Sequence, residues 1–158
     1  MAPFQPQIFV NLPVANLQKA HAFYNAIGLT CNPLFSDQGA SCMVLSEHIS
    51  VMIMTHEKFK EFMPSSKDLV SGRNGTEALL CITVEKKETV DEILEKGEQM
   101  GGKKNPTVLP EMEGMYGRSL EDVDGHVWEI MYMGGLEEAM KNKEKEVEKE
   151  EGKNSGVA

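Results

Sequence analysis

The first part of the chain alternates short apolar runs with one amphipathic segment. The run IFVNLPV at residues 8–14 has the composition of a β-strand, and Asn16 after it can cap a helix. The apolar residues of this helix recur at helical spacing: Leu17, Ala20, Tyr24 and Ile27. Gly28 is expected to end it. Two further apolar runs, ASCMVLS and ISVMIMT, flank Glu47 and His48, and this pattern indicates a β-hairpin.

The second part repeats the pattern after a polar connection. Residues 57–76 hold a short helical piece near Lys58 and then a stretch rich in Ser, Gly and Asn. ALLCITV at 78–84 indicates a strand, and residues 89–92 (TVDE) fit a capping box for a second helix that ends at Gly101 and Gly102. Further strands are expected around 118–120 and 126–133, with a turn between them.

An internal repeat orders these elements. GLTCNP at 28–33 matches GGKKNP at 101–106, and each lies just after a helix that follows a strand. Two copies of one unit are implied. The periodicity predicts strand, helix and three strands, twice, and hence an α+β fold of two βαβββ half-modules in one domain at 8–133. Residues 1–7 form an N-terminal extension, and the charged residues 134–158 form either a charged helix or a disordered tail.

The composition of the chain indicates which partners and which cellular location to expect. The chain has 158 residues and a net charge of −9, which disfavours nucleic acid as a partner. No apolar window reaches the length of a membrane span, so no membrane partner is expected. The odd number of cysteines, Cys31, Cys42 and Cys81, in strand-like stretches suits buried thiols in a reducing compartment. A cytoplasmic location is therefore expected.

The two ends of the predicted domain resemble a known superfamily. FVNLPVANLQKAHAFYNAIGL and GRSLEDVDGHVWEIMYM look like the signature ends of the glyoxalase/bleomycin-resistance/dioxygenase proteins, the vicinal-oxygen-chelate superfamily. The residues that match its first motif are Val14, Asn16, Leu17, Phe23, Tyr24 and Gly28, with Ile27 in place of Leu. Those that match its second motif are Asp122, Asp124, Gly125 and Glu129, with Val123 in place of Pro. The resemblance implies a curved mixed sheet around a small-molecule pocket and a homodimer.

Most of the positions that correspond to the metal ligands of these enzymes carry no ligand residue. The resemblance implies metal ligands on four strands, and the corresponding positions here are Phe9, residues 51–53, Leu79 or Leu80, and Glu129. Asn11, two residues after Phe9, is a poor substitute, so only Glu129 is a ligand residue at a ligand position. One carboxylate cannot hold a catalytic divalent ion with useful affinity. No cofactor is predicted, although His56, Glu57 and His126 leave open a metal bound at other positions.

Strand alternation suggests what the pocket contains. Val127, Glu129 and Met131 share one side of the last strand, and the resemblance directs Glu129 into the concave sheet. The floor then also receives Phe9, Asn11, Leu79, Cys81 and Thr83. Arg118 is the nearest cation in sequence. It either holds an anionic substrate group beside a general base at Glu129, or forms a structural ion pair with it. Tyr116 lies in EMEGMYGRS, which is either a mobile lid or an ordinary connection.

Two functions remain open from the sequence. The first is a glyoxalase-like lyase or isomerase that acts on a small, partly apolar molecule, with Glu129 as its catalytic residue and Phe9, Asn11, Cys81, Thr83, Tyr116 and Arg118 as ligand-binding residues. The second is a metal-free protein of the bleomycin-resistance type that binds or sequesters a small ligand. The lack of ligand residues at three of the four metal positions favours the second.

Overall fold

The computed structural model of the protein describes residues 4–154, with side chains to residue 147. Residues 1–3 of the predicted N-terminal extension and residues 155–158 of the tail lie outside the described part. The first module contains β1 (Ile8–Val14), α1 (Leu17–Ala26), β2 (Thr30–Asn32), a 3-10 turn (Pro33–Phe35), β3 (Ala40–Ser46) and β4 (Ile49–Thr55). The second contains β5 (Leu80–Val84), α3 (Lys87–Gln99), β6 (Lys103–Lys104), β7 (Tyr116–Glu121) and β8 (Val127–Tyr132). The short helix α2 (His56–Lys60) and a linker join the modules, and α4 (Leu136–Asn154) follows them.

Each module forms its own mixed four-stranded sheet. The strand orders are β1-β4-β3-β2 and β5-β8-β7-β6, so the two modules have the same topology. The first and last strands of each module pair in parallel, with Asn11 opposite Met52 and Cys81 opposite Glu129. The remaining pairs are antiparallel. The predicted α+β fold of two βαβββ half-modules is confirmed.

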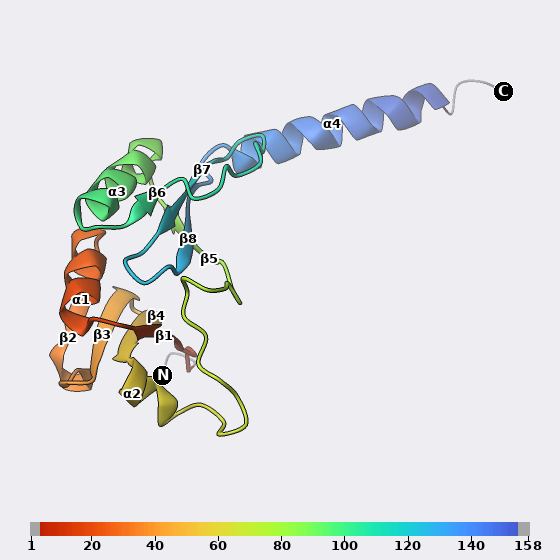
Figure 1. Ribbon diagram of the computed structural model, residues 1–158. Coiled ribbons are helices and arrows are strands. Elements are labelled where there is room, and N and C mark those ends of the chain that lie inside the picture. Colours follow the sequence, from red (N-terminus) through yellow and green to blue (C-terminus); the bar gives the residue numbers. More distant parts are fainter. Residues whose placement is uncertain (1–3, 155–158) are drawn as a thin grey trace.

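The hydrophobic core lies where the two modules meet. Helices α1 and α3 contact each other, with α3 above α1 at the left of Figure 1, and each covers one face of its own sheet. Side chains from both modules join one buried cluster, including Phe23 and Tyr24 of α1, Leu94 of α3, and Leu120 and Trp128 of the second sheet. Neither module can bury its apolar face without the other, because the cluster draws on both.

A buried polar contact fixes the modules to each other. The Tyr24 hydroxyl donates to Asp122 Oδ2 at 2.5 Å and accepts a hydrogen bond from Trp128 Nε1 at 3.2 Å. Burial raises the pKa of Asp122, and burial together with the nearby Asp122 charge raises the pKa of Tyr24 well above its ordinary value. The contact places Asp122 of the DVDG turn, which the second motif contributes, against Tyr24 of the first.

The same turn organises the backbone around it. Asp122 Oδ1 accepts from the amides of Asp124 at 2.9 Å and His126 at 2.8 Å, while Asp124 Oδ1 accepts from Ala15 N at 2.8 Å. Gly125 has φ +94°, and a Cβ there would lie 2.6 Å from the carbonyl carbon of Gly72 in the linker. The turn therefore holds both the end of β1 and the linker.

Three local expectations are wrong. Helix α3 begins at Lys87, with Lys86 as a cap that forms no side-chain bond, so residues 89–92 lie inside the helix and form no capping box. The strand before it ends at Val84, which leaves only two residues for the turn. Helix α2 begins at His56, before the predicted position, because Thr55 caps it by accepting from Lys58 N. Cys42 is buried, but Cys81 is exposed, because its side of β5 carries no helix.

The charged tail is a helix over most of its length. Helix α4 points away from the two modules in Figure 1, and only its start packs on them, with Ala139 buried. Gly135 N donates to Gly114 O at 3.1 Å, which connects the start of α4 to the segment before β7. Within residues 4–154, neither α4 nor any other helix combines the length and apolarity that a membrane span requires.

Candidate functional site

Glu129 lies at the centre of the sheet face that points away from α3. Trp128 and Ile130 point into the core, so alternation directs Glu129 to the outer face. Cys81 of β5 and Ser119 of β7 lie directly opposite Glu129 on the two neighbouring strands. The outer face of the second sheet is formed by Cys81, Thr83, Lys103, Gly117, Ser119, Glu121, Val127, Glu129 and Met131. The structure thus places three predicted site residues, Cys81, Thr83 and Glu129, on one face.

Glu129 is a carboxylate that takes part in no ion pair among the described side chains. The residue is half-buried. Partial burial and the Glu129 charge raise the pKa of the Cys81 thiol, so this cysteine is a poor nucleophile near neutral pH. At Glu129 the face can therefore offer a carboxylate acceptor whose immediate neighbours, Cys81, Ser119, Val127 and Met131, are small or apolar.

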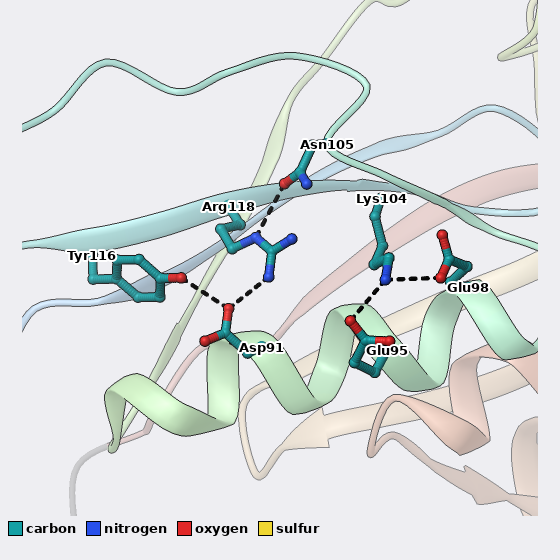
Figure 2. A network of polar contacts seen from close by, with 7 residues as sticks. All are labelled: Asp91, Glu95, Glu98, Lys104, Asn105, Tyr116 and Arg118. Carbon is teal, nitrogen blue, oxygen red and sulfur yellow. Dashed lines mark hydrogen bonds and ion pairs between the residues drawn. The ribbon is translucent and has the colours of Figure 1, made fainter.

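The predicted pairing of Arg118 with Glu129 is wrong. Ser119, and not Arg118, shares a face with Glu129, because Arg118 lies opposite Ile130 on the helix side of the sheet. Arg118 Nη1 instead forms an ion pair with Asp91 Oδ1 of α3 at 2.6 Å, as Figure 2 shows. The hydrogen bond from Arg118 lowers the pKa of Asp91. The helical period of α3 could have predicted this pair, because it places Asp91 beside the buried residues Val90 and Leu94 and so toward the sheet.

Tyr116 belongs to the same helix-side network. Its hydroxyl donates to Asp91 Oδ1 at 2.8 Å, and the Lys87 ammonium lies 4.6 Å from the centre of its ring. Tyr116 and Arg118 also line a cavity of about 770 Å³ beneath residues 105–115, where Met131 of the outer face contributes as well. Residues 111–113 and 115 of the expected lid segment line this cavity. Gly114 of the same segment accepts a hydrogen bond from Gly135 N, just before α4.

Phe9 and Asn11 lie on the other sheet. Both occupy the side of β1 that points away from the core residues Leu12 and Val14. Asn11 lines a second cavity of about 340 Å³, bounded by the linker and by the start of β8 at Val127. Phe9 is 46% exposed on the edge strand. Glu129, Cys81 and Thr83 are not among the residues that line this cavity, so the predicted site residues form no single pocket within the described chain.

The donor set does not fit the divalent metal that the fold implies. At the four strand positions only Glu129 carries a ligating side chain, and Met52 stands opposite Asn11 where a carboxylate or imidazole would be needed. Among residues 4–154, no group of three His, Cys, Asp or Glu side chains is close enough to hold an ion. His126 does not converge on Glu129, because its Nε2 lies 2.8 Å from Pro13 O at the module seam.

Comparison with solved structures relates this arrangement to known proteins. The hypothetical protein SA1046 from S. aureus is 23% identical, with a TM-score of 0.66 over 82% of this chain and 95% of that one. A glyoxalase/bleomycin resistance protein/dioxygenase family enzyme from Burkholderia phytofirmans is 18% identical, with a TM-score of 0.68 over 79% and 96%. The fosfomycin resistance protein FosX from Listeria monocytogenes is 18% identical, with a TM-score of 0.58 over 86% and 98%.

The sequence comparisons add no closer relationship. No protein-family model matches the chain, and no curated protein matches it. TM-scores of 0.58 to 0.68 and the coverage of nearly the whole of each neighbour establish the fold. This chain therefore has the vicinal-oxygen-chelate fold of the glyoxalase/bleomycin resistance/dioxygenase proteins.

Proposed function

We propose that this protein binds a small, partly apolar molecule on the outer face of the second sheet without a metal ion. The observation that carries the proposal is the isolation of Glu129, a half-buried carboxylate that, among the described residues, belongs to no group of three metal-ligating side chains and to no ion pair. An unpaired carboxylate among apolar groups favours a ligand that brings its own positive charge. The ligand class is therefore an amphipathic cation. Binding of a small molecule agrees with neighbours of this fold described as bleomycin or fosfomycin resistance proteins.

Replacing Glu129 by glutamine is expected to weaken binding of the amphipathic cation rhodamine 6G about fivefold, which corresponds to about 1 kcal/mol for a partly exposed ion pair. Fluorescence anisotropy against protein concentration measures the change. The matched control is Glu92→Gln, which removes the same charge from the exposed side of α3 and should leave binding unchanged. Equal weakening by both variants would mean that the dye senses only the net charge.

The competing function is catalysis with Glu129 as a general base. Binding should persist after dialysis against a chelator, and mass spectrometry should recover each bound amphipathic amine chemically intact. If the chelator removes a metal and binding is lost with it, the binding proposal is wrong. If the protein converts the bound amine and Glu129→Gln abolishes this turnover, an enzymatic function of the lyase or isomerase type replaces it.

We further propose that the protein is a homodimer that covers its apolar edges. Strands β1 and β5 end their sheets, and they carry or adjoin exposed apolar side chains such as Phe9 at 46% and Leu79 at 57%. Unpaired edges with apolar side chains favour association with a second chain.

Native mass spectrometry of the wild type is expected to give twice the monomer mass, and Phe9→Asp is expected to give a monomer. The control Leu34→Asp alters an 88% exposed residue far from both edges and should remain dimeric. A monomeric wild type would contradict the proposal.

A further inference from the structure

We propose a second ligand site in the cavity beneath residues 105–115, for an uncharged and largely apolar molecule with a carbonyl or amide acceptor. The cavity of about 770 Å³ lies within the size range of small-molecule pockets. It shares Gly117 and Met131 with the outer face but not Glu129, Cys81 or Thr83, and its oriented polar side chains, Asn105 and Arg118, lie at the edge and on the helix side of β7. The residues that carry the argument are Asn105, Leu109, Met112, Gly117, Arg118 and Met131.

Arg118 presents donors to this cavity in a fixed orientation. Its Nη1 is held by Asp91 Oδ1 at 2.6 Å and its Nε by Asn105 Oδ1 at 3.1 Å. Figure 2 shows both bonds and a second terminal nitrogen with no partner among the residues drawn. The planar guanidinium is thus fixed at two points, and its remaining N–H groups can meet an acceptor without further ordering of the side chain.

Asn105 adds a second oriented donor. Arginine has only donors, so Asn105 must use its Oδ1 toward Arg118, which leaves the Nδ2 amide group free to donate. The backbone anchors this residue, since Asn105 N donates to Ser119 O at 2.8 Å. Its φ of +51° is the single left-handed value outside glycine in the described chain. Asparagine adopts this conformation readily, so the side chain is positioned at little cost.

Gly117 lies at an unpaired edge of the sheet. Strand β6 pairs only with Leu120 and Glu121, so among the described strands β7 has no neighbour on that side at Gly117. The Ser119 carbonyl points to this edge, where it meets Asn105, and strand alternation directs the N–H and C=O of Gly117 the same way. The cavity therefore receives a backbone donor and acceptor next to Arg118.

The charges select an uncharged ligand. Asp91 already neutralises Arg118, and Glu111 and Glu113 line the cavity, so a carboxylate ligand would meet more negative than positive charge. An uncharged acceptor can use the free donors without this repulsion. The walls provide Leu109, Met112 and Met131, and methionine adapts to apolar groups of varied shape.

The test compares two matched probes on the full chain. 1-Naphthaleneacetamide is uncharged, and 1-naphthaleneacetate has the same ring with a carboxylate. In ¹H–¹⁵N NMR titrations the amide is expected to shift the Gly117 backbone signal and the Arg118 Nε–H signal saturably, and to bind several-fold more tightly than the acetate. Asn105→Asp keeps the acceptor for Arg118 Nε but removes the Nδ2 donor, and it should weaken amide binding about tenfold.

Controls separate this site from the proposed function. Asn32→Asp makes the same change in the first module, at an asparagine whose Oδ1 accepts from Leu34 N. This variant should leave amide binding unchanged. Glu129→Gln should also leave it unchanged, while Asn105→Asp should leave rhodamine 6G binding unchanged. Three results would overturn the second site: tighter binding of the acetate than of the amide, no saturable shift at Gly117, or full amide affinity in Asn105→Asp. None of them bears on the proposed binding at Glu129.

Discussion

Replacing Asp122 by alanine is expected to lower the free energy of unfolding by about 3–5 kcal/mol. Asp122 is 3% exposed and accepts three hydrogen bonds, from the Tyr24 hydroxyl and from the amides of Asp124 and His126. Alanine leaves these donors without an acceptor at the seam between the modules. Equilibrium unfolding in urea, followed by far-UV circular dichroism, measures the loss.

The control for this result is Asp37→Ala. Asp37 also accepts two backbone amides, from Gly39 and Ala40, but it lies in an exposed turn where water can replace it. Its loss should cost only about 1 kcal/mol. Equal destabilisation by the two variants would mean that burial at the seam adds nothing to the hydrogen bonds of Asp122.

Replacing Gly125 by alanine is expected to destabilise the protein by about 2–5 kcal/mol and to loosen the linker. Its φ of +94° strains any residue with a Cβ, and that Cβ would lie 2.6 Å from the backbone nitrogen of Arg73. Backbone atoms cannot move aside as a side chain can, so the linker must shift. Urea unfolding measures the stability, and the rate of tryptic cleavage at Lys67 and Arg73 measures the exposure of the linker.

Gly28→Ala isolates the backbone strain from the contact. Gly28 has φ +110°, but a Cβ there would meet no atom within 4 Å. This variant should cost about 1–2 kcal/mol and leave tryptic cleavage of the linker unchanged. If both variants cost the same, the close approach of Gly72 to Gly125 makes no contribution to stability.

Much of the fold could be predicted from the sequence, because its signals are local. The strand Ile8–Val14, the hairpin at Glu47 and His48, and the repeat with glycines at 28 and 101 all follow from period and turn chemistry. Both glycines have positive φ just before the short strands β2 and β6. The predicted start of α3 is wrong. Strand β5 ends at Val84, and the helix begins at Lys87, before the polar residues 89–92 that suggested a cap.

The candidate site was only partly predictable. Alternation correctly directs Cys81, Thr83 and Glu129 to one face, because neighbours in register keep a period of two. Nearness in sequence predicts that Arg118 lies beside Glu129, but its position in the period of β7 turns it toward Asp91 instead. Phe9 and Asn11 lie on a separate sheet, and the relation between two sheets depends on packing that no local pattern contains.

The placement of both helices on the inner faces of the sheets also bears on how this protein can change over evolutionary time. The core lies at the junction of the modules, whereas Cys81 and Thr83 are exposed on the opposite side of their strand. Substitutions at such exposed positions usually change stability by less than about 0.5 kcal/mol. The binding preferences that we propose for the outer face can therefore diverge while the modules stay folded.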